Sequence, residues 1–273
     1  MTIANREATF ANQGWYPSQP GVLDRQLAQY SKVSDTNPIT ACGVVSPHAG
    51  YRYSGAVAGA LFASVRIPDV VVVLAVNHRG FGHPASVWNG GDWEIPGDTV
   101  KINRTVSQAI IQRCPFVQGD TAAHIAEHSA ELQLPFLHYH NPKVTTAVIC
   151  LKLLRKEQCI ELGVALAELL TDIAPDSLIV ASSDLNHYED QQTTLMKDQW
   201  VIDRMLALDP EGLYETVAHQ DVSMCGFVPA TVTLAACRSL GANHASLIRH
   251  TTSADVSGDF STVVGYAGIR FVR

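Results

Sequence analysis

The segment VVVVLAVNHRG, residues 70–80, joins an uninterrupted apolar run to a short polar ending that contains a histidine. A run of this length that is rich in valine and ends in polar residues is typical of a strand buried on both faces of a parallel sheet. Similar runs alternate with helical patterns along the chain, which predicts an α/β protein with a mostly parallel sheet. These further runs are residues 41–46, 145–151, 177–182 and 263–269.

Weaker patterns complete the predicted fold. A strand is expected at residues 246–250, with edge strands at 85–88 and 100–102. The polar stretch 251–259 is expected to be a loop and is a candidate lid. Glycine and proline do not cluster into a linker, so one domain over residues 1–273 is favoured over two. Helices are expected at residues 22–30, 55–65, 104–113, 129–138, 156–173, 194–208, 211–220 and 229–240.

Composition and charge exclude several classes of protein. Hydrophobic residues make up 47% of the chain and charged residues 16%, which excludes intrinsic disorder. The net charge of -7 comes with no cluster of basic residues, which argues against a nucleic-acid partner. The longest apolar run is too short to cross a bilayer and the N-terminus lacks a secretory signal, so we expect a cytoplasmic protein without a membrane partner. The 6 cysteines form no CxxC pair, and we expect them to be reduced.

Two histidines directly follow predicted strands. His48 lies in the polar, glycine-containing turn SPHAGYRYSG at residues 46–55, and His78 lies in NHRG at residues 77–80. Loops that follow consecutive parallel strands emerge at the same edge of a sheet, where α/β proteins bind their ligands. His48 and His78 can therefore face one another. For either histidine alone, a solvent-exposed side chain is the alternative interpretation.

Asp184 and His187 follow a third predicted strand, in the sequence SSDLNH at residues 182–187. The same topological argument brings both side chains to the edge that carries His48 and His78. An aspartate in this position can instead cap the next helix, and that alternative stays open for an isolated motif of this kind.

Cys225 lies in the sequence SMCGF just before a predicted helix. A helix N-terminus stabilises a thiolate through its dipole, so this cysteine is placed for chemistry. A buried cysteine that acts as a small hydrophobic residue is the alternative.

His128 and Glu131 are three residues apart in the sequence EHSAEL at residues 127–132. His128 directly precedes the helix expected at residues 129–138, and at helical spacing both side chains would lie on one face. A solvated surface pair is the alternative interpretation.

Taken together, these motifs resemble the Memo family, in its prokaryotic AmmeMemoRadiSam system protein B type. The resemblance covers nearly the whole chain, and the motifs occur in the order and at the spacings of the family. It implies a fold similar to the class III extradiol ring-cleaving dioxygenases, a three-layer αβα arrangement. Prokaryotic members are often encoded beside a radical-SAM enzyme, which implies a functional link to such an enzyme. The motifs are PHAGY with YSG at 47–55, NH at 77–78, EHS at 127–129 with Glu131, SSD at 182–184 with His187, and CG at 225–226.

The resemblance also implies the composition of a metal site. Class III dioxygenases hold iron with two histidines and a carboxylate, whereas in this chain Cys225 would take the place of the carboxylate. Iron is therefore the first expectation. Copper and zinc are alternatives, because a thiolate is a softer ligand than a carboxylate. The implied roles are metal ligation by His48, His78 and Cys225, catalysis by His187 and Asp184, and lining of the pocket by His128 and Glu131.

Two functions follow from these expectations. The first is a non-haem, metal-dependent oxidoreductase in which His187 is the acid and base and Asp184 fixes the tautomer of that histidine. The second is a non-catalytic, metal-dependent binding or scaffold protein that uses a degenerate dioxygenase pocket. Animal members of the family are described as binding phosphotyrosine peptides, so the partner is either a small-molecule substrate or a peptide.

Overall fold

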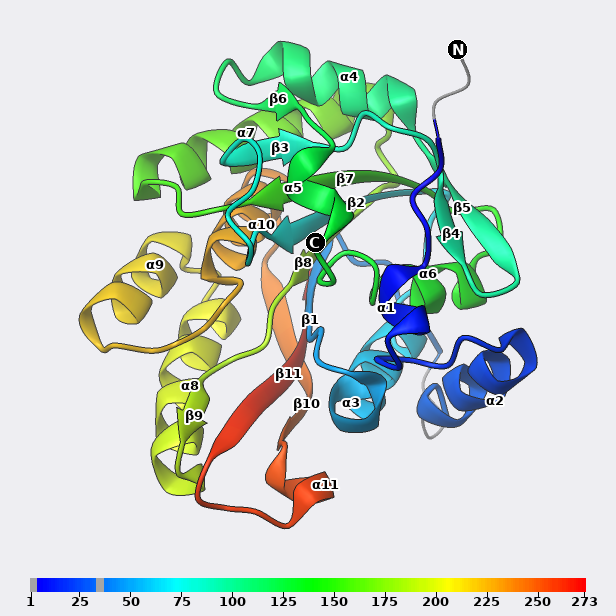
Figure 1. Ribbon diagram of the computed structural model, residues 1–273. Coiled ribbons are helices and arrows are strands. Elements are labelled where there is room, and N and C mark those ends of the chain that lie inside the picture. The colour runs from blue at the N-terminus through cyan, green and yellow to red at the C-terminus, as the bar shows by residue number, and fades with distance from the viewer. Residues whose placement is uncertain (1–3, 33–36) are drawn as a thin grey trace.

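Four of the predicted strands lie side by side and parallel in the middle of one sheet (Figure 1). This computed structural model describes residues 4–32 and 37–273. The parallel strands run in the spatial order β1 (Gly43–Ser46), β8 (Leu178–Ser182), β2 (Val70–Val76) and β7 (Thr145–Leu151). All four are almost entirely buried, as their continuous apolar sequences require.

Antiparallel strands extend the sheet on both sides. Strand β11 (Val263–Val272) pairs with β1, and β10 (His244–Thr252) pairs with β11. On the other side, β3 (Ala85–Val87) lies antiparallel to β7, and β5 (Asp98–Ile102) lies parallel to the start of β7. The sheet is therefore mixed with a parallel centre, as predicted. Three short strands were not expected: β4 (Trp93–Ile95), β6 (Gln118–Gly119) and β9 (His187–Glu189).

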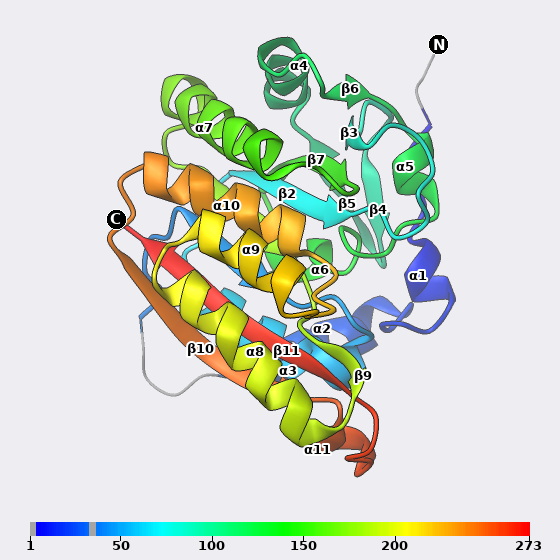
Figure 2. The ribbon, with the colours of Figure 1, turned by 90° about the vertical axis from the view of Figure 1, so that its left-hand side faces the viewer.

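Helices cover both faces of the sheet (Figure 2). Along β2, Val71 and Val73 pack into one core with Phe62 of α3, whereas Val72 and Leu74 pack into another with helices of the opposite face. This alternation is the basis of the predicted three-layer αβα arrangement, which the structure confirms. The first face carries α2 (Pro20–Tyr30), α3 (Tyr51–Ala63) and α6 (Leu134–His140), and the second carries α4 (Arg104–Arg113), α7 (Lys156–Ile173), α8 (Gln191–Leu206), α9 (Pro210–His219) and α10 (Phe227–Ser239). The short helices are α1 (Thr9–Asn12), α5 (Ala122–Ile125) and α11 (Ala254–Ser257).

Among the described residues, none of the helices combines the length and the apolar character that a membrane crossing needs.

The helix expected at residues 129–138 begins only at Leu134, and this prediction was wrong in its first turn. Residues 129–133 form turns because their polar side chains bind distant backbone and side-chain groups instead of facing solvent along a helix. Pro135 fits the helix that does form because it occupies the first turn, where its missing N–H is not needed. His128 and Glu131 therefore do not share a helical face.

The segment 251–259 also differs from the expected loop. Strand β10 continues to Thr252, and α11 occupies the next few residues before Gly258 ends it in the left-handed region, with φ 72°. The idea that this segment is a lid stays a prediction.

Candidate metal centre

Three histidines from three different loops converge at the carboxyl ends of the parallel strands. His48 follows β1, His78 follows β2, and His128 lies in the turns before α6. One ring nitrogen of each lies within 4.8 Å of the others, an arrangement that can hold a metal ion. The ring centroids are 4.7 to 5.2 Å apart. The predicted meeting of His48 and His78 is confirmed, and His128 joins them.

Glu127 lies between two of these histidines and fixes their rings. Its Oε1 atom is 3.0 Å from Nδ1 of His78 and 3.3 Å from Nδ1 of His128. The backbone N–H groups of His78 and Ser129 also donate to the carboxylate. Burial opposes ionisation, but the hydrogen bond from His78 and the adjacent imidazoles outweigh it and lower the pKa of Glu127 to about 2. The ionised carboxylate therefore holds the proton of His78 on Nδ1, which leaves Nε2 with a free lone pair.

The tautomer of His48 follows from a chain of hydrogen bonds. Ser182 donates its hydroxyl proton to the Ser129 carbonyl over 2.7 Å and accepts a hydrogen bond from the Gln133 amide over 2.8 Å. Nδ1 of His48 lies 2.9 Å from the same hydroxyl oxygen and must be the donor, because the only hydroxyl proton is already used. Nε2 of His48 is then unprotonated and faces the other histidines, as metal ligation requires.

Burial keeps His48 and His128 uncharged. Loss of solvent, followed by the repulsion of neighbouring histidines, lowers the pKa of each to about 3. Neutral imidazole is the form that binds a metal, so the ligands do not have to lose a proton at neutral pH. The orientation of the three rings, the tautomers of His48 and His78 and the neutral state of His48 and His128 all fit an ion bound by imidazole nitrogen.

Cys225 lies beside this cluster, just before α10. Its Sγ atom is 3.2 Å from Nε2 of His48 and 3.7 Å from the Asp184 carbonyl. Burial and the nearby Asp184 carboxylate raise the pKa of Cys225, so the metal-free protein carries a thiol that donates to His48. The ligand set of His48, His78 and Cys225 stays a prediction. The histidine cluster adds His128, which sequence reasoning had assigned only to the pocket.

Asp184 and His187 both reach the same edge of the sheet. Asp184 accepts hydrogen bonds from the backbone N–H groups of His48 (2.8 Å) and Ala49 (3.3 Å), so it orders the loop that carries the first histidine. His187 does not depend on Asp184 for its tautomer, contrary to our expectation. Its Nδ1 donates to the Ser223 carbonyl over 2.8 Å, because the loop before Cys225 runs directly beside it. Catalytic roles for both residues stay predictions.

Glu131 does not line the cavity, which corrects its expected place. Its carboxylate is buried and accepts from Arg6 at 2.5 Å, from the hydroxyl of Tyr16 at 2.9 Å and from the backbone N–H of Phe10 at 2.8 Å. Arg6 also donates to the carbonyls of His124 and Glu127. Glu131 thus ties the N-terminal segment to the turns that carry His128, because a buried carboxylate needs a charged partner.

A cavity of about 510 Å³ opens over the histidine cluster. This volume suits a small-molecule ligand. Trp15 forms part of its wall, and the centroid of the Trp15 ring lies 4.5 Å from that of the His128 ring. The lining residues are Trp15, His48, Ala49, Gly50, His78, His128, Asp184, His187, Tyr188, Ser223, Cys225, Val264 and Tyr266.

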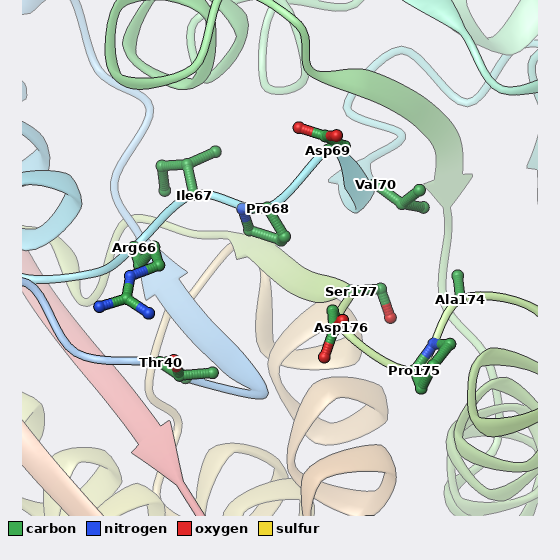
Figure 3. A pocket seen from close by; sticks show the side chains of 11 residues that line it. Thr40, Arg66, Ile67, Pro68, Asp69, Val70, Ala174, Pro175, Asp176 and Ser177 are labelled. Carbon is green, nitrogen blue, oxygen red and sulfur yellow. The ribbon is translucent and has the colours of Figure 1, made fainter.

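A second cavity, of about 520 Å³, lies at the opposite ends of β1, β2 and β8 (Figure 3). Its charged lining residues are Arg66, Asp69 and Asp176, all of which are exposed to solvent. The described residues that line it include no histidine or cysteine. The groups suited to metal chemistry therefore gather at the other edge of the sheet.

Sequence reasoning missed the residues that orient the histidines. Glu127 belongs to the EHS motif at residues 127–129, but helical spacing favours Glu131 as the partner of His128. Glu127 could have been found because it is adjacent to His128, and carboxylates commonly orient metal-binding histidines. Ser182 and Gln133 carried no comparable signal, since their contacts depend on the tertiary fold.

Comparison with known proteins supports the predicted resemblance. The family model of the Memo-like protein matches residues 6–270. A MEMO1 family protein of Methanopyrus kandleri is 36% identical over 95% of this chain and 96% of its own length. One of Thermotoga maritima is 42% identical over 84% of this chain and 81% of its own length. The crystal structure of an uncharacterized protein from Escherichia coli K12 shares the fold, with a TM-score of 0.56 and 14% identity, covering 84% of this chain and 98% of that one.

Proposed function

The chain belongs to the Memo family, and from this premise we propose that it is a metal-dependent oxidoreductase that acts on a small molecule in the cavity over the histidine cluster. The observation that supports the proposal best is the convergence of His48, His78 and His128 with their ring orientation set by Glu127 and Ser182. Buried partners of this kind are expected where rings must be held for an ion, because they raise affinity by pre-organising the ligands.

The chemistry divides between the ion and the side chains around it. When bound, a redox metal such as iron, with copper as the alternative, supplies Lewis acidity and electron transfer. The chain itself supplies orientation and proton transfer. His187 donates from Nδ1 to the Ser223 carbonyl, so its Nε2 is the atom that can take a proton from a substrate hydroxyl group. Trp15 and Tyr266 give the cavity apolar walls that exclude water from the reacting groups.

Cys225 adds a sulfur ligand that the class III dioxygenases lack. Its thiol already lies within contact distance of Nε2 of His48, so binding of a metal there would replace the thiol proton with the ion. A site with imidazole and thiolate ligands favours softer and more readily reduced metals than one with imidazole and carboxylate. We therefore propose a redox reaction that need not be ring cleavage.

The proposal is tested by anaerobic loading of the protein with Fe(II), followed by measurement of oxygen consumption with a panel of catechols and aminophenols. We expect stoichiometric metal binding and turnover in the parent protein. His187→Ala should keep the metal and lose turnover, whereas the exposed His244→Ala, as a matched control, should change neither. Metal analysis of protein purified anaerobically from its native host identifies the ion.

Two outcomes would redirect the proposal. Metal binding without turnover on any member of the panel, with all positions around the ion filled by protein, would favour a metal-dependent binding protein. Ring cleavage gained only by Cys225→Glu, which supplies the carboxylate that class III dioxygenases use as a ligand, would show that the parent site performs a different reaction from the dioxygenases.

A further inference from the structure

Tyr188 occupies a backbone position that normally belongs to glycine. Strand β9 pairs with β11 through Glu189 with Val263 and His187 with Val264, and the register shifts between these pairs. Tyr188 is the extra residue of this bulge, and its φ is 62°. In bulges of this type the left-handed position is usually glycine, because a side chain there strains the backbone.

Packing within the protein does not explain the tyrosine. Its side chain is 76% exposed, so it contributes little buried surface in return for the strain. Leu208 offers a contrast, since it has a φ of 54° but packs its side chain against a hydrophobic core. Backbone strain that no folded-state contact offsets is typical of residues held for function.

Hydrogen bonds hold the residues on both sides of Tyr188. The N–H of His187 donates to the Ser223 hydroxyl over 2.7 Å, and the carboxylate of Glu189 accepts from Asn186 at 2.7 Å and from Lys197 at 2.8 Å. The bulge therefore fixes the direction in which the tyrosine ring leaves the strand, which is a recognised use of bulges near active sites.

The ring of Tyr188 lies at the mouth of the cavity over the histidine cluster. It lines that cavity together with Trp15 and Tyr266, and its centroid is 5.4 Å from that of His187. Since His187 and Tyr188 line the same cavity, a ligand bound at the histidines can extend against the exposed ring of Tyr188. A rigid ring with an exposed face is suited to bind a planar group through stacking.

We propose that Tyr188 determines specificity by stacking on a planar, unsaturated group of the substrate, at the end that points away from the histidine cluster. This inference rests on the proposed function, since it takes the histidine cluster to hold the metal-binding end of the same molecule. It adds that the substrate carries a conjugated or aromatic portion beyond its metal-binding atoms.

The test compares two probes that chelate a metal identically, acetohydroxamic acid and benzohydroxamic acid. Their affinities for the zinc-loaded protein are measured by calorimetry, and the ratio of the two isolates the contribution of the phenyl ring. We expect the preference for benzohydroxamate to fall about threefold to tenfold in Tyr188→Asn and to survive in Tyr188→Phe. Affinity for acetohydroxamate should not change in either variant.

A second measurement separates a functional ring from a structural one. Because asparagine adopts positive φ readily, Tyr188→Asn should keep or raise the denaturation midpoint of the metal-free protein. Leu208→Asn, the matched variant, should lower the midpoint and leave the probe ratio unchanged.

The possible failures are distinct. An unchanged probe ratio in Tyr188→Asn, or a lowered midpoint, would overturn the role of Tyr188 and leave the metal site intact. A wild-type protein that binds neither zinc nor the chelating probes would overturn the proposed function and this inference with it.

Discussion

The cavity at the carboxyl ends of β1, β2 and β8 and the cavity at their amino ends differ little in volume, at about 510 and about 520 Å³. At the amino ends, the charged groups are Arg66, Asp69 and Asp176, and all three residues are exposed to solvent. At the carboxyl ends, His48 and Asp184 are buried, and other protein side chains hold the rings of His48, His78 and His128. The two cavities thus differ in how their side chains are held and not in volume. Partners that fix the lining side chains are the better indication of a functional site.

The largest expected difference between the two cavities is in metal binding. His48→Ala removes one of three converging imidazoles and should abolish measurable zinc binding, a loss of more than about 100-fold. Asp69→Ala, at the other cavity, should leave the affinity unchanged. Calorimetric titration of both variants with zinc checks the prediction, and tight binding retained by His48→Ala would move the metal site elsewhere.

A second difference concerns stability. Arg6→Met leaves the buried carboxylate of Glu131 without its charged partner and should lower the free energy of unfolding by about 3–5 kcal/mol. Arg66→Met changes an exposed arginine at the other cavity and should cost less than about 0.5 kcal/mol. Urea denaturation of the two variants makes the comparison. Equal effects would mean that the Arg6 and Glu131 pair does not support the fold.

A more moderate effect is expected when the orientation of the histidines is loosened. Glu127→Gln keeps the shape of the side chain but removes the charge that holds Nδ1 of His78 and His128. Zinc affinity should fall about 10-fold to 100-fold. Asp176→Asn is the corresponding change at the other cavity and should have no effect on zinc affinity. An undiminished affinity in Glu127→Gln would show that the rings hold their positions without the carboxylate.

A further effect is on the pH dependence of stability. Burial, and then the nearby Arg6, lower the pKa of His124 to about 3 from its usual 6.5. The unfolded chain therefore takes up a proton at His124 as pH falls below 6.5, whereas the folded protein does not until about pH 3. Stability is lost across this window, at about 1.4 kcal/mol per pH unit from this residue.

His124→Gln should reduce that slope in the metal-free protein, and the exposed His244→Gln should not. Denaturation curves recorded from pH 7 to pH 4 provide the measurement. An identical slope in wild type and His124→Gln would show that this histidine already titrates normally in the folded state.

The framework of the site could be predicted because it depends on local patterns. The apolar run at residues 70–76 is found as β2 with the predicted limits, and the parallel pairing of β1, β2 and β8 follows from the same pattern. Once the strands are parallel, their ends share an edge, so the meeting of His48 and His78 needs no knowledge of side-chain packing.

Most of the contacts that hold the site together could not be predicted because they join residues far apart in sequence. Arg6 and Glu131 are 125 residues apart, and neither carries a local signal of the other. Helical periodicity favoured Glu131 over Glu127 as a partner of His128, but the chain forms turns there because tertiary hydrogen bonds outweigh helical propensity. The bulge at Tyr188 is a shift in the pairing of β9 with β11, so the sequence of β9 alone does not predict it.

Under the proposed function, the distance along the chain between the parts of the site would also govern when a newly made protein can bind an ion. His48 meets Cys225 across 177 residues, and the turns that hold His128 are secured by the first residues of the chain. Such contacts form late, since the intervening chain must be synthesised and folded first. A ribosome-bound fragment that ends before Ser182 and Cys225 would lack two partners of His48, so metal uptake would be complete only after these residues have folded.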